Sequence, residues 1–398
     1  MVIVMTVEQR TSRDAAPPAG RYAYLDNIKV LMVMGVIVAH AVFAFTGVGT
    51  WVFREEPLRE PALSVITLLA VIGGMVGVAP FFLISGLVTP RSLQRKGFRR
   101  FSVDRLVRLG VPMALFVLVM SPFIEYVDPD NAGWDAGFAA FVPHIWWPPA
   151  PGPTWFLGVL LLFSLVYALT REMMPPKQRA TPALSVSFLL AAAVVLAGAD
   201  YLARLAVPLG EERFRLALGQ APAWVVAFAV GVVAGERGWF DAIPRRVARA
   251  ARWMWVLGLV GAVAVFVGVV AAGSGPEAFA GGGTWQSAVL VVPESALVVG
   301  ISVWMIDVFH RRFDNQGGLG YELSRAAYAA FFLHQGVLVL LVLASRRLGW
   351  PPEADFAAVG VLGVVFSFGV AMLLVRVPGL CLRLVHFAAG EGRPSHQP

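Results

Sequence analysis

Long apolar runs, separated by short polar segments, make up most of this chain. Inside a bilayer only a helix or a closed barrel satisfies every backbone polar group, and a spanning helix needs roughly 17–25 mostly apolar residues. Most of the runs have about that length, so we predict an all-α fold, a polytopic bundle of transmembrane helices. The ten predicted spans cover residues 28–46, 62–88, 109–124, 155–170, 183–199, 221–235, 253–272, 286–306, 326–345 and 356–375. The fourth to sixth are short for a bilayer, which predicts that they are tilted, extended or irregular.

The composition supports this class. Of 398 residues, 58% are hydrophobic and 14% are charged, whereas soluble domains carry about 25% charged residues. A chain with so few charges cannot cover a water-facing surface, so membrane lipids are expected to contact most of it. We predict one transmembrane domain at residues 27–378, between cytoplasmic tails at 1–26 and 379–398, in the cell (cytoplasmic) membrane.

The basic residues are distributed unevenly between the predicted loops. With both termini in the cytoplasm, the inside segments hold 25 of the 32 Lys and Arg residues. This bias agrees with the positive-inside rule, so both tails are predicted to be cytoplasmic. Loop 125–153, the longest, is then outside, where it could fold over the mouth of a site. Orientation accounts for the net charge of +7, and no basic face or basic soluble domain indicates a nucleic-acid partner.

Several kinds of chemistry are excluded by the sequence. The single cysteine, Cys381, allows neither an intramolecular disulfide nor a C-x-x-C metal site. There is no P-loop, dinucleotide fingerprint, H-E-x-x-H or G-x-S-x-G motif in a supporting context, which argues against ATP-driven transport and the common soluble hydrolase designs. No metal site and no permanently bound cofactor are predicted.

Three ionisable residues lie within the predicted spans, where such residues are costly and usually functional. They are His40, Glu294 and His334, the candidate catalytic residues. Each histidine could instead form a structural hydrogen bond to a neighbouring helix. Glu294 is the only carboxylate that these boundaries place in a span. It follows Pro293, which frees a backbone carbonyl and favours a local break that lines a polar cavity.

Lys29 and His40 are expected to share one face of the first span. Eleven residues are close to three helical turns, or about 16–17 Å. Lys29 would then lie at the cytoplasmic end beside Asp26, with His40 deeper in the bilayer. Histidine suits a general base because its ordinary pKa is near neutrality. Lys29 could alternatively extend to the interface as a structural residue.

A basic segment precedes the third span. Within it, Arg105 and Arg108 are three residues apart on one helix face. Such a pair can hold phosphate groups. The alternative is that the segment only sets the orientation and binds lipid headgroups, but this explains less well why two arginines reach the start of the span.

Together these residues resemble the membrane-bound acyltransferase-3 family, which includes polysaccharide O-acetyltransferases and glucan succinyltransferases. The first-helix motif of that family is an arginine, ten residues and a histidine, but here Lys29 stands in the arginine position. A lysine keeps the charge and loses the bidentate geometry of arginine. The matching segments, in family order, are 21–40, 80–86, 101–112 with its R-x-x-R element, 154–157 and 328–334.

The resemblance implies an O-acyltransferase. The expected donor is cytoplasmic acyl-CoA, carrying an acetyl or succinyl group, and the expected acceptor is a hydroxyl of an extracytoplasmic or lipid-linked glycan. The donor is expected to bind at Lys29, Arg105 and Arg108. Further site candidates are Asp26, Ser85, Trp155 and Tyr328.

Two other functions are compatible with the same residues. A proton-coupled secondary transporter would also use intramembrane His and Glu residues, and proton-coupled uptake without acyl transfer would identify it. A non-catalytic partner of a glycan-export assembly would lose only complex formation when His40 is changed. The order of the matching segments favours the enzyme.

Overall fold

The computed structural model describes residues 22–47, 55–127, 137–144, 150–174 and 183–388. Within that part of the chain, ten helical segments are long and apolar enough to cross a membrane. The same residues contain no strand beyond one isolated bridge between Arg213 and Leu216. The prediction of an all-α, multi-pass membrane protein is therefore confirmed.

The helices follow one another as antiparallel spans joined by short connections. They are α1 (Ala23–Thr46), α2 (Ala62–Val76), α3 (Ala79–Lys96), α4 (Phe98–Arg105), α5 (Val111–Leu115), α6 (Ser121–Tyr126), α7 (Phe138–Phe141), α8 (Trp155–Met173), α9 (Val186–Ala206), α10 (Ala221–Arg237), α11 (Arg245–Ala271), α12 (Trp285–Arg312), α13 (Gly318–Ser345) and α14 (Pro352–Ala388). Two π-helical segments, η1 (Leu106–Gly110) and η2 (Phe116–Met120), join α4, α5 and α6 into the third span. Short 3₁₀ turns include η4 (Val142–His144), η5 (Gly152–Thr154), η6 (Leu218–Gln220) and η7 (Pro276–Phe279).

The predicted spans have the right positions, but several helices extend past the predicted bounds. The second span extends to Lys96 and is interrupted between Val76 and Ala79, next to Pro80, which has no amide hydrogen to donate. The fifth span continues to Ala206 rather than 199. The last apolar span ends at Arg376, although helix α14 itself runs on to Ala388. The predicted tails otherwise fall largely on residues 1–21 and 389–398, outside the described residues.

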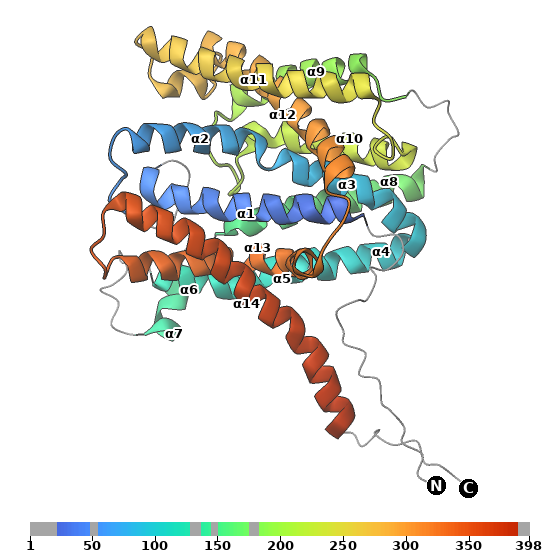
Figure 1. Ribbon diagram of the computed structural model, residues 1–398, viewed down its shortest axis with the longest axis vertical. Helices are drawn as coiled ribbons and strands as arrows, with labels where there is room; N and C mark the ends of the chain where they lie inside the picture. Colours follow the sequence, from blue (N-terminus) through green and yellow to red (C-terminus); the bar gives the residue numbers. More distant parts are fainter. Residues whose placement is uncertain (1–21, 48–54, 128–136, 145–149, 175–182, 389–398) are drawn as a thin grey trace, which may run out of the picture.

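Helix α1 occupies the middle of the bundle (Figure 1). It packs against α13 and α14 on one side and against α2 and α12 on the other. The most extensive helix pairs are α3 with α10, α11 with α12, and α13 with α14. The face of α1 that includes Ile37 is therefore covered by protein, which is where a polar residue can be kept out of lipid.

Glycine allows α3 and α10 to approach at backbone distance. A Cβ atom at Gly231 would lie against the carbonyl group of Leu83, and one at Gly86 would meet the backbone of Phe228. Small residues at such contacts let transmembrane helices pack closely, since van der Waals contact drives their association in lipid. This contact fixes α3, which carries part of the basic surface described below.

Candidate functional site

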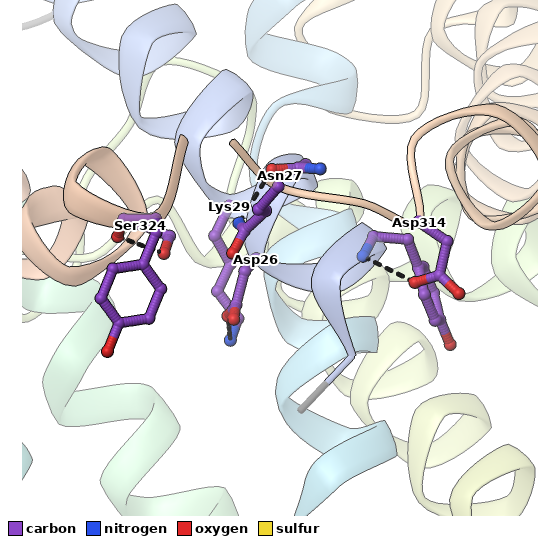
Figure 2. Close-up of polar contacts among 8 residues, drawn as sticks. Asp26, Asn27, Lys29, Asp314 and Ser324 are labelled. Atoms are coloured by element: carbon purple, nitrogen blue, oxygen red, sulfur yellow. Dashed lines mark hydrogen bonds and ion pairs between the residues drawn. The ribbon is translucent and has the colours of Figure 1, made fainter. Parts of the chain in front are cut away.

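The first turn of α1 is fastened to the loop between α12 and α13 (Figure 2). The Asn27 side chain donates to the carbonyl oxygens of Phe313 (2.8 Å) and Asn315 (3.0 Å). It also accepts a hydrogen bond from Gln316 (2.9 Å). The Tyr24 amide donates to Asp314 (3.2 Å). These bonds fix the start of α1 beside the start of α13.

That attachment brings two histidines to similar depths. His40 lies thirteen residues beyond Asn27 on α1, a rise of about 20 Å, and His334 lies sixteen residues beyond Gly318 on α13, a rise of about 24 Å. Because the two helices begin at the same side and pack together, their histidines meet. The ring centroids of His40 and His334 are 4.9 Å apart, with the rings at 74° to each other.

Both imidazoles are oriented by a carbonyl of their own helix. His40 Nδ1 lies 2.8 Å from the carbonyl oxygen of Val36, and His334 Nδ1 contacts that of Phe331. A carbonyl oxygen only accepts, so each Nδ1 carries the hydrogen and each Nε2 is the basic nitrogen of the neutral ring. Both bonds lie within one helix, so neither is the hydrogen bond to a neighbouring helix that a purely structural histidine was expected to form. His334 is fully buried, and its Nε2 has no hydrogen-bond partner in the described chain.

The described end of loop 125–153 reaches the neighbourhood of this histidine pair. Turn η5 packs on α13 and η2, where Gly152, at φ 46°, lies against Gln335. The Oε1 atom of Gln335, the residue after His334, is buried and has no partner among the described residues. Residues 128–136 and 145–149 of the loop lie outside the described part, so closure of the loop over the pair stays a prediction.

Two of the three residues predicted to bind a donor, Arg105 and Arg108, line an open cleft on the predicted cytoplasmic side, here called the basic cleft. It has a volume of about 570 Å³ and lies between the start of α1, the end of α3, the α4–η1 segment and the end of α10. Five cations line it, against the carboxylates of Asp104 and Asp241: Arg91, Arg95, Lys96, Arg105 and Arg108. This excess of positive charge suits a phosphate-bearing ligand.

Arg105 and Arg108 have different environments within the basic cleft. Arg105 is partly buried over the Phe101 ring, with its guanidinium carbon 5.0 Å from the ring centroid, and its Nε has no partner in the described chain. Arg108 is 71% exposed and pairs with Asp104 at 2.9 Å. Arg105 therefore has an unused donor, while Arg108 would exchange one anionic partner for another.

Tyr328 holds the arginine-bearing span against α13. Pro112 has no amide hydrogen, so the carbonyl of Arg108, four residues earlier, lacks its normal helical donor. The Tyr328 hydroxyl donates to that carbonyl at 2.6 Å. The adjacent η1 segment is π-helical, a geometry that often occurs at functional sites. Tyr328 thus connects the helix of His334 to the basic cleft.

The remaining predicted site residues lie elsewhere. Lys29, whose side chain is 43% exposed, forms an ion pair with Asp26 at 3.1 Å. Neither residue lines the basic cleft. The Ser85 carbonyl accepts a bond from Thr89 (2.7 Å), whose hydroxyl faces Arg105 at 3.5 Å. Trp155, at the start of α8, lies 4.6 Å from the Trp224 ring.

Glu294 has a partner that the sequence interpretation missed. Its two oxygens accept from both terminal nitrogens of Arg204, at 2.7 Å each. Asp200 lies one turn before Arg204 and is 2% exposed, so Glu294 is not the only carboxylate buried in a span. The error follows from ending the fifth span at 199. The spacing Asp-x-x-x-Arg next to an apolar run was the available signal. Neither His40 nor His334 lines the cavity around Glu294.

These features define a class: a multi-pass membrane protein with a buried histidine pair and a basic cleft at one end of the bundle. Comparison with protein families assigns the chain within that class. The acyltransferase domain of the acyltransferase-3 family matches residues 22–376, and the chain belongs to that family. It is a membrane acyltransferase. No curated protein and no solved structure matches the chain.

Proposed function

We propose that this acyltransferase moves an acetyl or succinyl group from cytoplasmic acyl-CoA to a hydroxyl of an extracytoplasmic or lipid-linked glycan. The observation that carries the proposal is the pair of His40 and His334, whose rings are 4.9 Å apart and whose Nδ1 atoms are both held by backbone carbonyls. An imidazole fixed in this tautomer presents Nε2 as a base toward a substrate hydroxyl.

The proposed reaction uses one of these rings to activate the acceptor. The hydroxyl oxygen attacks the thioester carbonyl carbon while an imidazole Nε2 takes the hydroxyl proton. The carbon–sulfur bond breaks, the new ester bond remains, and the proton returns to the sulfur of the departing CoA. Losing a general base typically slows a reaction by about 10²–10⁴-fold.

The donor is proposed to bind with its phosphates in the basic cleft. Leu25 lines that cleft on α1, and His40 lies fifteen residues further along the helix, or about 22 Å. The long pantetheine arm of CoA separates its thioester from its phosphates, so one molecule can approach both regions. Arg105 supports this assignment best, because it combines partial burial with an unused donor.

The transporter alternative has less support. Membership of an acyltransferase family does not favour it. In addition, His334 and Glu294, which could have formed a proton relay, lie in two different sites. His334 faces His40, whereas Glu294 is bound by Arg204. Proton-coupled uptake by purified protein in vesicles, without any acylated product, would nevertheless replace the proposal.

Mass spectrometry of lipids and glycans from cells with and without the gene tests the reaction. A mass difference of one acetyl or succinyl group identifies both the acyl group and the acceptor. In cells that express His40→Gln, the rate of product formation is expected to fall by about 10²–10⁴-fold. Glutamine can form hydrogen bonds but does not take up a proton. His310→Gln is the matched control, since His310 stacks on Tyr24 at 4.7 Å. Near-normal product from a folded His40→Gln protein would remove His40 from the mechanism.

A further inference from the structure

A second buried polar site lies between α9, α12 and the interruption of α2 and α3. Its cavity, here called the Asp200 cavity, has room for about one water molecule. Three charged side chains line it, with exposed fractions of 0% for Arg204, 2% for Asp200 and 4% for Glu294. Charges this deeply buried are strongly unfavourable unless they are paired.

The single cation of this site is committed to one of its two carboxylates. Arg204 uses both terminal nitrogens on Glu294, at 2.7 Å each. Asp200, four residues before Arg204 on the same helix face, is left with Oδ1 unpartnered in the described chain. The Nε atom of Arg204 is unpartnered as well. One positive charge therefore faces two buried carboxylates.

In the part of the chain that the structure describes, the charged side chains that line the cavity are those of Asp200, Arg204 and Glu294. None of the other lining side chains there balances the excess negative charge. Among the described residues, η6 and α10 contribute Gln220 and Trp224 to the cavity, which do not titrate in this range, and α11 contributes none of its lining. The interrupted span contributes only apolar side chains and Gly74. A proton needs no additional space, so it can supply the missing positive charge.

We propose that Asp200 and Glu294 share one bound proton, which resides on Asp200 while Arg204 is paired with Glu294. In this arrangement, Asp200 is a neutral acid and the charges of Arg204 and Glu294 cancel. A second neutral arrangement has the proton on Glu294 and the guanidinium on Asp200. Exchange breaks the O–H bond at one carboxyl group and forms it at the other, with the proton passing through a cavity water while Arg204 changes partner.

The alternative pairing changes how two helices are joined. With Arg204 on Glu294, the ion pair crosses from α9 to α12. With Arg204 on Asp200, it lies within one turn of α9, and the crosslink between the helices is lost. The site is thus a connection between α9 and α12 that depends on which carboxyl group holds the proton, and it does not depend on which acyl group or acceptor the enzyme uses.

Infrared spectroscopy of the full-length protein in lipid vesicles tests the proposal. A protonated carboxylic acid has a carbonyl band distinct from that of a carboxylate, and the band shifts in deuterated water. The wild-type protein is expected to show one such band that disappears in Asp200→Asn. It should also disappear in Glu294→Gln, because the remaining carboxylate then pairs with Arg204 in its ionised form.

The control is Asp307→Asn on α12, where a buried aspartate has its own cation, Arg311, at 2.7 Å. That change should leave the band intact. Either variant of the site carries the test alone if the other does not fold. A band that persists in both folded variants, or the absence of any band that they remove, would overturn the shared proton.

Discussion

Breaking the buried ion pair of Arg204 and Glu294 should destabilise the protein far more than breaking an exposed pair. Removing one member of a buried pair leaves an uncompensated charge and typically costs about 3–5 kcal/mol. Arg204→Met keeps an apolar stem of similar length but leaves two carboxylates without a cation. We expect its free energy of unfolding to fall by about 3–5 kcal/mol. Unfolding can be followed by SDS titration in mixed micelles, using the tryptophan fluorescence of the protein, to which Trp224 beside the cavity contributes.

Glu294→Gln should be less harmful, because a second carboxylate is available. Asp200 lies one turn from Arg204 and can accept the guanidinium after a small rotation of the side chain. A hydrogen bond to a charged group contributes about 1.5–3 kcal/mol, so the net loss should be only about 1–2 kcal/mol. Asp200→Asn combined with Glu294→Gln removes both partners and should return the loss to about 3–5 kcal/mol.

The exposed pair of Glu322 and Arg325 provides the control. Their side chains are 31% and 40% exposed and 3.6 Å apart, and such pairs contribute about 0–1 kcal/mol. Glu322→Gln should therefore stay within that range. If Glu294→Gln costs as much as Arg204→Met, and Asp200→Asn adds nothing to it, then Asp200 does not serve as a second partner and the reasoning fails.

Two further predictions concern the donor site and helix packing. Replacing both Arg105 and Arg108 with Gln should weaken acyl-CoA binding at least about tenfold, because each charge-assisted contact contributes about 1.5–3 kcal/mol. Calorimetry of the purified protein measures the affinity, with Arg246→Gln as the exposed control. Unchanged affinity would remove both arginines from the site. Gly231→Ala should destabilise the protein by about 1–3 kcal/mol, because its Cβ would press on a carbonyl group of α3. Gly198→Ala, which meets no atom within 4 Å, should not destabilise the protein, and equal effects of the two changes would contradict close packing of α3 on α10.

The sequence was sufficient to find His40 and His334 but not to bring them together. An ionisable residue inside an apolar run stands out by itself, whereas the contact between α1 and α13 depends on where distant segments dock. That docking rests on hydrogen bonds between Asn27 and the carbonyls of the loop at 313–316. Backbone carbonyls are present in every loop, so their use as a specific anchor leaves no pattern in the sequence.

The polar residues at the ends of apolar runs were harder to place. Asp200 and Arg204 lie where hydropathy falls, so the apolar pattern ended the fifth span before them. The helix continues because Leu202 and Leu205 still face outward, at 65% and 47% exposed, while the two charged side chains turn inward. One helix face thus remains suitable for lipid and the other for a buried partner, a division that average hydropathy does not detect. The partner, Glu294, is on a helix whose position the local sequence does not specify.

Proline connects these observations. Three of the prolines within spans of this protein lie beside a polar contact or cavity, and one of them, Pro293, does so without breaking its helix, because α12 continues through it. Pro112 leaves the Arg108 carbonyl to be bound by the Tyr328 hydroxyl. Pro80 follows the break whose residues Val78 and Ala79 line the Asp200 cavity, and Pro293 precedes Glu294 in the same cavity.

The physical reason is that a proline removes one backbone donor, and in lipid the freed carbonyl must find another partner within the protein. Helix breaks and polar side chains are therefore expected to occur together. In a polytopic chain, a proline near an ionisable residue marks a buried polar site more specifically than either residue does alone. By this criterion Pro293 and Glu294 mark the buried polar site around Arg204, while a catalytic role for Glu294 stays a prediction. The arginine beside it is the cation that such a buried carboxylate requires.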